Sequence, residues 1–444
     1  MDFERARWQA RLDELARNHH VPGACLAVLV DGEVHELASG LLNSVSGVDM
    51  TTDSLFQIGS VSKLFTATLV MQLIDEGRLE LDTPVRAVLP EFRLADRVAT
   101  ECVTVRHLLS HTSGIEGAFH PDTGSDADCL RRYVEACAGL GQCHPVGATV
   151  SYCHSGYIIA GHVVERITGK DWDAALRERL LDPLGLRDTV TLPGVPHQRR
   201  RAFGHMGDPG QPPRIDRWDL PRSLGPGGGI YTTAADLITF ARMHLADGAG
   251  LLSPALTTAM REPQRKVPDG WTDEHRGLGW LLFGWGGRQV YGHAGIGLGQ
   301  HTFLHVVQDQ RIAIALLANG GDAVALHTDL HSELLGELAG LTVPRLDVPA
   351  HPPEVDVAPL VGTYRNILSV VRVAADDTGL WAMPVYSSAL GVSPPRRIEL
   401  LPVTSTVFAG YDPAHHYPRP WTFYTLPDGT RYALAGGSSI PRVA

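Results

Sequence analysis

Runs of residues typical of β-strands stand at both ends of the first 341 residues, and helical patterns fill the stretch between them. Near the beginning, residues 24–30 and 34–38 form two apolar runs joined by an Asp-Gly pair, which favours a tight hairpin turn. Strand-like runs return only at residues 279–285, 301–307 and 311–318. This order predicts an α/β or α+β domain whose sheet joins the two ends of the segment.

The middle of this segment carries apolar residues at helical spacing. Residues 3–17 predict an amphipathic opening helix, and residues 60–76 predict a helix that starts after Gly59 and ends near Gly77. Further helices are expected at residues 105–110, 157–168, 172–181 and 234–245.

A change of composition follows Leu341. Five prolines crowd a short span, which is typical of a linker: Pro344, Pro349, Pro352, Pro353 and Pro359. Beyond it, short β-like runs alternate with turn residues, and no helical pattern is evident. We therefore expect a main domain at residues 1–341, a linker at 342–359 and a small all-β barrel or sandwich at 360–444.

The composition excludes several classes of function. The 444 residues include 38 Lys+Arg and 49 Asp+Glu, a net charge of −11 without a long basic block, so nucleic acids and anionic membranes are poor partners. No apolar run approaches the ~18 residues that cross a bilayer, and no secretory signal is visible, so we expect a cytoplasmic protein that does not bind membranes. The six cysteines contain no Cys-x-x-Cys pair, and we expect no metal and no cofactor.

The segment most indicative of chemistry is Ser60-Val-Ser-Lys63, at the start of the helix expected at residues 60–76. Three residues apart on a helix, Ser60 and Lys63 occupy neighbouring surface positions. A lysine that has lost its hydration can act as the base that makes a serine hydroxyl nucleophilic. The alternative is a serine that caps the helix beside a solvated lysine, and this segment alone favours neither.

Two more segments strengthen the chemical interpretation. Residues 150–169 contain Tyr152 and His154, and residues 291–297 contain His293. Together with Ser60-Val-Ser-Lys63, they resemble the serine β-lactamase and penicillin-binding-protein superfamily, in the branch of class C β-lactamases, D-aminopeptidases, β-lactamase-like esterases and transacylases. Supporting likeness is found at residues 103–114, 224–236 and 277–280.

The resemblance extends over about residues 10–340 and implies a fold with an antiparallel sheet and an all-helical subdomain. The β-rich tail, with Leu360-Val-Gly-Thr-Tyr364, resembles the lipocalin-like barrel that some members append. The fold class implied is therefore α/β (α+β), a β-lactamase/transpeptidase-like domain followed by a small C-terminal β-barrel.

The resemblance also implies roles for individual residues. Ser60 is the acylated nucleophile, Lys63 is the base or proton relay beside it, and Tyr152 passes a proton to the leaving group and later activates the acceptor. Positive charge on Lys63 and His293 would make the Tyr152 phenolate more accessible by lowering the pKa of the phenol.

The strand motif that is Lys-Thr-Gly in many relatives, and His-x-Gly in others, corresponds to His293, Ala294 and Gly295. The resemblance then implies an oxyanion hole made by the backbone N–H groups of Ser60 and Ile296.

One position departs from the pattern. The second motif is commonly Tyr-x-Asn, and His154 stands at the position of the asparagine. A neutral imidazole can accept a hydrogen bond from Lys63 and donate one to a substrate, whereas a protonated one would oppose Lys63 and depress both pKa values. The change argues against β-lactam turnover more than against acyl-enzyme formation, and a purely space-filling role for His154 is the alternative.

The leading functional hypothesis is a serine acyl-enzyme catalyst that cleaves an ester, amide or thioester of a small or peptidic substrate. A transacylase or peptide cyclase of the penicillin-binding-protein-type thioesterase kind is the second hypothesis, with a carrier protein as its partner in the cyclase case. The third is a non-catalytic descendant that only binds peptides, which His154 alone favours. The choice between water and an amine acceptor rests on water exclusion and pocket shape, which the sequence does not show.

Overall fold

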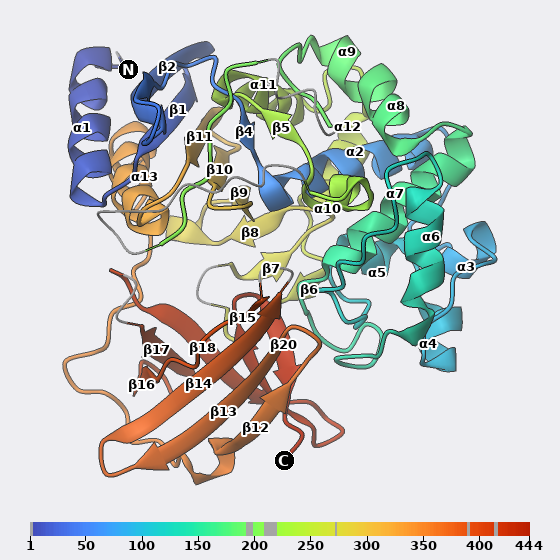
Figure 1. The fold of residues 1–444 in the computed structure, drawn as a ribbon, viewed down its shortest axis with the longest axis vertical. Coiled ribbons are helices and arrows are strands. Elements are labelled where there is room, and N and C mark those ends of the chain that lie inside the picture. Colours follow the sequence, from blue (N-terminus) through green and yellow to red (C-terminus); the bar gives the residue numbers. More distant parts are fainter. Residues whose placement is uncertain (1–2, 192–198, 208–219, 271–272, 389–390, 413–415) are drawn as a thin grey trace.

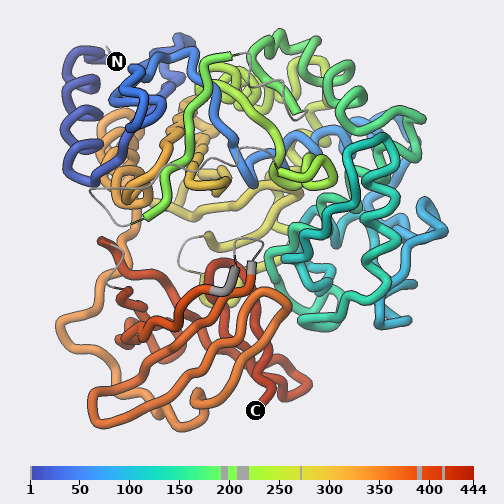
Figure 2. Tube along the Cα trace, in the orientation of Figure 1, coloured from blue at the N-terminus to red at the C-terminus, as the bar shows by residue number. Residues whose placement is uncertain are grey.

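The computed structural model describes residues 3–191, 199–207, 220–270, 273–388, 391–412 and 416–444. A main domain of helices around a large sheet precedes a barrel, and the barrel lies below the main domain in Figure 1. The tube in Figure 2 shows the chain passing from one to the other through residues 340–357, a stretch with no helix or strand. The domain boundaries at residues 341 and 360 stay a prediction.

The main sheet is antiparallel and has the strand order β3-β2-β1-β11-β10-β9-β8-β7-β6. Its centre pairs β1 with β11, so strands from the two ends of the domain meet as the sequence predicted. The strands span Gly23–Val30 (β1), Glu33–Asn43 (β2), Val48–Asp49 (β3), Arg265–Lys266 (β6), His275–Arg276 (β7), Leu281–Phe283 (β8), Val290–Ile296 (β9), His301–Val307 (β10) and Ile312–Ala318 (β11). A separate two-stranded ribbon joins Phe56–Gln57 (β4) to Tyr231–Thr232 (β5).

Helices cover both faces of this sheet, which explains why β1 is apolar at every position and buried throughout. Cys25, Ala27 and Leu29 face the core that contains α2 and α11, while the alternate residues face the core beneath α1 and α13. Helix α13 was not predicted from the sequence, although its leucines recur every four residues from Leu326 to Leu338.

The expected helix at residues 60–76 forms in two parts, because a 3₁₀ turn over Gly59–Val61 leads into α2. Helix α2 is buried along nearly its whole length and packs against α7. The helices span Arg5–Asn18 (α1), Ser62–Asp75 (α2), Val85–Val88 (α3), Arg97–Cys102 (α4), Val105–Leu109 (α5), Cys129–Ala136 (α6), His154–Thr168 (α7), Trp172–Leu176 (α8), Asp182–Leu184 (α9), Gly225–Gly228 (α10), Ala234–Leu245 (α11), Pro254–Met260 (α12) and Ala323–Ala339 (α13).

The tail forms a barrel rather than a sandwich, with the strand order β12-β13-β14-β16-β17-β18-β19-β20. The ends of this sheet come together where Thr363 bonds to Val443 and Ala444 and Tyr364 bridges to Arg442. Aromatic side chains fill its interior. The strands span Gly362–Arg365 (β12), Ser369–Asp376 (β13), Gly379–Ser388 (β14), Gly391–Val392 (β15, paired with β14), Ile398–Pro402 (β16), Val407–Tyr411 (β17), Arg419–Thr425 (β18), Arg431–Ala435 (β19) and Ser438–Pro441 (β20).

Among the described residues, no helix combines the length and the apolar character needed to cross a membrane.

Candidate active site

The site is built where the 3₁₀ turn before α2 touches the end of strand β9. Gly59 lies in this turn with φ of +52°, and a Cβ there would come within 2.6 Å of the Ile296 carbonyl oxygen. Glycine is therefore required, both by its backbone conformation and by the close approach of β9. This contact fixes Ser60, the next residue, beside the strand that carries His293.

Ser60 and Lys63 are in contact. The Lys63 ammonium nitrogen Nζ lies 3.1 Å from the Ser60 Oγ, although Lys63 itself has no exposed surface. Burial lowers the pKa of Lys63 to about 7 because the charged form loses its hydration. No carboxylate among the described residues pairs with this lysine. The alternative of a solvated lysine beside a capping serine is therefore wrong.

The surroundings of Lys63 suit its neutral form. Its Nζ also lies 2.6 Å from the Gly227 carbonyl oxygen and 3.1 Å from the His154 Nδ1. A neutral amine has two N–H donors and one lone pair. The two donors can bond to Gly227 and His154, which leaves the lone pair for the Ser60 hydroxyl proton.

His154 begins helix α7 and is held on both sides of its ring. Because Nδ1 accepts from Lys63, the ring carries its proton on Nε2, which is buried without a hydrogen-bond partner among the described residues. A Cβ on Gly227 would lie 2.8 Å from the ring, so this glycine leaves the space that the imidazole fills. Burial, reinforced by Lys63, holds the pKa of His154 well below its usual range. The contact with Lys63 contradicts a purely space-filling role.

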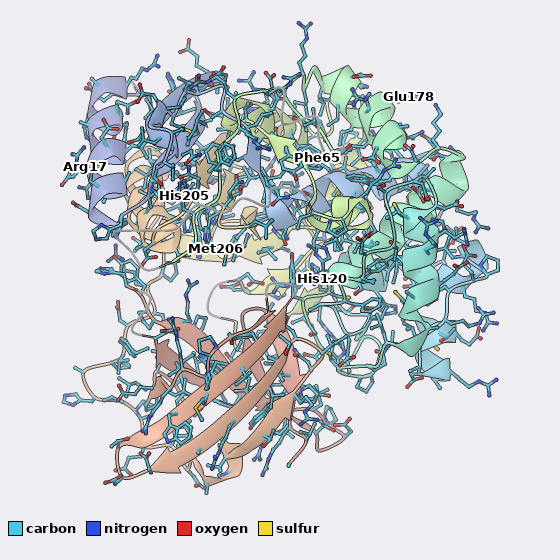
Figure 3. The ribbon with its side chains drawn as sticks, viewed as in Figure 1. Arg17, Phe65, His120, Glu178, His205 and Met206 are labelled. Atoms are coloured by element: carbon cyan, nitrogen blue, oxygen red, sulfur yellow. The ribbon has the colours of Figure 1, made fainter. Side chains whose placement is uncertain are left out.

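His120 adds a second imidazole beside His154. The two ring centroids are 5.1 Å apart in an edge-on arrangement, and burial lowers the pKa of His120. In Figure 3, His120 lies at the border between the main domain and the barrel. No motif in the sequence pointed to His120.

Tyr152 lies beside the same lysine, with Lys63 Nζ 4.9 Å from the centre of its ring. Its hydroxyl makes no hydrogen bond of normal geometry with any described residue, although Ser60 is near enough to lower its pKa. Burial outweighs this effect and raises the pKa of Tyr152 above the ordinary value of a phenol. The expectation of a more accessible phenolate is therefore wrong, because the ring is out of water.

His293, on β9, is a second residue whose protonation state differs from the sequence expectation because the side chain is buried. Its pKa falls to about 3, chiefly through burial and then through Lys63, so the ring is neutral at pH 7 and supplies no positive charge to Tyr152. Its Nδ1 donates to the Ala294 carbonyl oxygen over 2.7 Å, which leaves Nε2 as an acceptor. That Nε2 is buried, with no partner among the described residues. The ring centroids of His293 and Tyr152 are 6.2 Å apart.

The end of β9 lies directly on the turn that carries Ser60. A Cβ on Gly295 would lie 3.1 Å from the Ser60 backbone nitrogen and 1.9 Å from the Ile58 carbonyl oxygen. Gly295 is therefore confined to this contact, whereas the side chains of Ala294 and Ile296 are exposed, Ile296 to 69%. The backbone of Ser60 and the backbone of Ile296 are thus adjacent, the arrangement that an oxyanion hole requires.

Two supports of Tyr152 were missed by the sequence analysis. The Tyr152 backbone N–H donates over 2.9 Å to the carbonyl oxygen of Gly437, which lies in the turn between β19 and β20 of the barrel. Next to it, Ser439 N–H donates to Ser151 Oγ, and Ser439 Oγ donates to the Val150 carbonyl oxygen. The barrel therefore holds the strand-like segment that presents Tyr152.

The second support is His111, which stacks on the Tyr152 ring with 4.4 Å between centroids. Its Nδ1 accepts a hydrogen bond from the Cys153 N–H over 3.0 Å. Burial holds the pKa of His111 well below its usual range, so a neutral ring supports Tyr152.

The chain matches the beta-lactamase family model over residues 8–335. The chain belongs to the beta-lactamase family. It is 51% identical over 376 residues to penicillin-binding protein 4 of Amycolatopsis lactamdurans, an alignment that covers 82% of this chain and 99% of that protein. The family places it among the serine hydrolases and confirms the predicted fold class.

Solved structures give the same fold. The structure of SurE aligns with a TM-score of 0.80 and 32% identity, covering 99% of both chains, and a SurE structure with D-Leu aligns with a TM-score of 0.78. A D-amino acid amidase from Ochrobactrum anthropi SV3, complexed with D-phenylalanine, aligns with a TM-score of 0.60 and 27% identity over 71% of this chain and 91% of its own.

Proposed function

We propose that the protein forms an acyl-enzyme on Ser60 and hydrolyses esters, amides or thioesters of peptidic acyl donors. The observation that carries the proposal is the 3.1 Å contact between Ser60 Oγ and a fully buried Lys63 whose pKa is lowered to about 7. A lysine with this pKa is about half unprotonated at neutral pH, so it can take the serine proton without a further partner.

Acylation then follows from the hydrogen bonds of the pocket. The Lys63 lone pair accepts the Ser60 proton as Oγ attacks the acyl carbon, and the oxyanion faces the N–H groups of Ser60 and Ile296. Tyr152, kept as a phenol by burial, donates its proton to the leaving group. The proton that Lys63 acquired restores the phenol, since its Nζ lies beside the tyrosine ring. The bond to the leaving group breaks and an ester of Ser60 remains.

His154 takes over two tasks of an asparagine in this scheme. Its Nδ1 holds one N–H of Lys63, which orients the lone pair, and its Nε2–H is the donor available to a substrate carbonyl oxygen. On the opposite side, His293 Nε2 is an acceptor available to a substrate N–H or to the incoming nucleophile. A peptide bond next to the scissile group offers both partners.

The proposed donors carry a D-configured residue. The support is that one full-length structural relative is described with D-Leu and another relative is named a D-amino acid amidase. The cytoplasmic setting expected from the sequence would favour intracellular esters and thioesters over cell-wall substrates.

Transfer of the acyl group to an amine, as in a transacylase or peptide cyclase, is the second candidate. The specific observation that favours it is the contact of the barrel with Tyr152, because the barrel borders the group that handles the acceptor's proton. SurE aligns with 99% of this chain and therefore also with the barrel, whereas the amidase aligns with only 71% of it. Of these two relatives, SurE is thus the one that shares the barrel beside Tyr152. In the cyclase case the acyl donor would arrive on a carrier protein.

A fluorophosphonate probe tests acyl-enzyme chemistry, with intact-protein mass spectrometry as the readout. We expect one adduct per chain, lost in Ser60→Ala and retained in Ser62→Ala, whose serine begins α2 two residues later and accepts a hydrogen bond from the Ile230 N–H. A native protein that is never labelled would instead support the non-catalytic peptide-binding descendant.

The acceptor is tested with D-configured and L-configured peptidyl thioesters, supplied with and without an added amine. Free acid as the main product under both conditions supports hydrolysis. Amide or cyclic product in preference to free acid would reverse the order of the two candidates, and faster turnover of the L-configured donor would contradict the proposed stereochemistry.

A further inference from the structure

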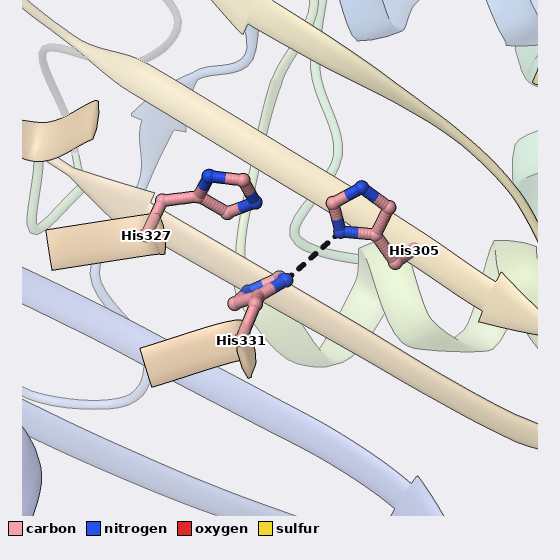
Figure 4. Close-up of side chains that lie close together, drawn as sticks. All are labelled: His305, His327 and His331. Carbon is pink, nitrogen blue, oxygen red and sulfur yellow. Dashed lines mark hydrogen bonds between the residues drawn. The ribbon is translucent and has the colours of Figure 1, made fainter. Parts of the chain in front are cut away.

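Three histidines of the main domain lie close together, as Figure 4 shows. His305 comes from β10, and His327 and His331 come from α13. Each can offer one ring nitrogen such that all three nitrogens lie within 4.8 Å of one another. The His305 and His331 Nδ1 atoms are already 2.9 Å apart.

The local sequence explains the convergence. His327 and His331 are four residues apart, so they lie one turn apart on the same face of α13. His305 alternates with Val306 along β10, and its side chain projects from the sheet face that α13 covers. The three ligands therefore come from two elements whose packing is fixed by the core around them.

Two ring nitrogens of this cluster lack a hydrogen-bond partner within the described part of the chain. The Nε2 atoms of His327 and His331 are buried without a hydrogen-bond partner among the described residues. His305 and His331 are 6% and 1% exposed. Buried polar groups are normally paired, so the unpaired Nε2 of His327, on a ring whose centroid lies 4.4 Å from that of His331 and 5.2 Å from that of His305, indicates a missing ligand.

The rings are also in the protonation state that metal ions need. Burial lowers the pKa of His305 to about 3 and holds those of His327 and His331 well below the usual range. All three imidazoles are neutral at pH 7, and a neutral imidazole is the form that binds metal.

We propose that His305, His327 and His331 bind one divalent transition-metal ion of the zinc class. Imidazole nitrogens suit Zn²⁺, Co²⁺, Ni²⁺ and Cu²⁺, and three histidines with a fourth position for water form a common tetrahedral site. Metal–nitrogen distances of about 2.0–2.1 Å need ligand nitrogens closer together than the 4.8 Å within which these three lie, so the rings would rotate toward the ion as it binds. Binding replaces the His305–His331 hydrogen bond, whose proton moves to an outer ring nitrogen.

The positive charge of Arg419 influences which fourth ligand the ion would take. Arg419, on β18 of the barrel, lies near enough to lower the pKa of His327. Its guanidinium would oppose a bare cation and would favour an anionic fourth ligand such as hydroxide. Asp322 and Asp412 act on Arg419 in the opposite sense and reduce this repulsion.

The ion would act as a structural clip rather than as part of the Ser60 chemistry. It would tie α13 to β10, and α13 in turn holds the barrel, since Asp322 accepts from the His416 N–H and Asp329 accepts from the Tyr417 hydroxyl. Metal loading is therefore expected to raise the melting temperature of the full-length protein.

The test uses untagged full-length protein, stripped with a chelator and titrated with Zn²⁺ and with Co²⁺. We expect one equivalent of zinc after gel filtration, and a visible Co²⁺ spectrum of tetrahedral nitrogen ligation without a thiolate band. His327→Leu and His327→Asn should each weaken zinc affinity more than about 100-fold, since even the loss of an indirect support costs 10–100-fold. His351→Ala, an exposed histidine between α13 and the barrel, is the matched control.

The inference is overturned by any of three results. These are an absence of bound metal in the native protein, equal zinc binding by the His327 variants and the control, or a thiolate-to-cobalt band that places the ion on cysteine. Circular dichroism and fluorophosphonate labelling of each variant establish that it is folded, so a loss of metal cannot be read from an unfolded chain.

Discussion

The buried nitrogens around Lys63 and those around His305 have different surroundings. Around Lys63, the Nζ atom has three partners within hydrogen-bond distance, namely the Gly227 carbonyl oxygen, His154 Nδ1 and Ser60 Oγ. Around His305, two of the three imidazoles keep a buried Nε2 without a partner among the described residues. Burial lowers the pKa values of both groups, so the arrangement of the nitrogens, and not the direction of the pKa shift, distinguishes the base beside Ser60 from three imidazoles that lie close to one another.

The largest effect is expected from Lys63→Ala, which removes the base but leaves the serine. We expect acylation by an ester substrate to fall by about 10³-fold or more, since the hydroxyl loses its proton acceptor. Stopped-flow or single-turnover kinetics measure this step. Acylation at the native rate would show that Lys63 is not the base. Proton transfer would then no longer distinguish its pocket from the histidine cluster.

The pH dependence should report the same lysine. Burial lowers the pKa of Lys63 to about 7, so the base form is present above pH 7 and is lost as the pH falls. We expect kcat/KM to drop about tenfold for each unit below pH 6, with an apparent pKa near 7. His293, with a pKa of about 3, and Tyr152, with a raised pKa, contribute no titration in this window. A flat profile between pH 5 and 8 would contradict the assignment.

Gly227→Ala tests whether the fit of His154 against its glycine matters. The new Cβ would lie 2.8 Å from the imidazole and must displace it from Lys63. A shift of this kind is expected to lower kcat by roughly 10–100-fold with the fold intact. Gly139→Ala is the matched control, because a Cβ there meets nothing within 4 Å. Equal activity of the two variants would mean that the position of His154 is not critical.

His154→Asn changes the chemistry of the second motif more gently. Asparagine keeps an acceptor for Lys63 and a donor for the substrate, so acylation by esters should stay within about tenfold of native. Turnover of amides should rise relative to esters, measured as the ratio of kcat/KM values on a matched ester and amide pair. A collapse of ester turnover would show that the imidazole itself is essential.

The smallest effect on acylation is expected from His327→Leu. This residue lies in the histidine cluster, outside the contacts made by Ser60 and Lys63, so the rate of fluorophosphonate labelling should stay within about twofold of native. A large fall in labelling of the folded variant would show that the two regions are coupled.

Much of the fold and the geometry of the site could be predicted because their signals are local. The Ser60–Lys63 spacing on a helix, the pairing of β1 with a late strand and the alternating runs of the barrel each follow from short patterns. The protonation states of Tyr152 and His293 could not be predicted, because they depend on burial by segments far away in the chain.

The same reason explains what the sequence analysis missed. Helix α13 has leucines at regular spacing, but His327 and His331 interrupt its apolar face. Their role as a cluster can be recognised only when β10 places His305 beside them. The support of Tyr152 by Gly437 joins two domains and leaves no trace in either segment alone.

The bonds between the β19–β20 turn and the Tyr152 segment can form only late in the synthesis of the chain. Ser151 and Ser439 are separated by 288 positions in the chain, so a ribosome must add all of these residues before the tyrosine receives its final support. At elongation rates of roughly 5–20 residues per second, this delay lasts about 14–60 seconds. In a nascent chain the pocket around Ser60 and Lys63 can form only after Gly227 and β9 have been made, and the segment of Tyr152 gains its last support later still, when the turn between β19 and β20 docks.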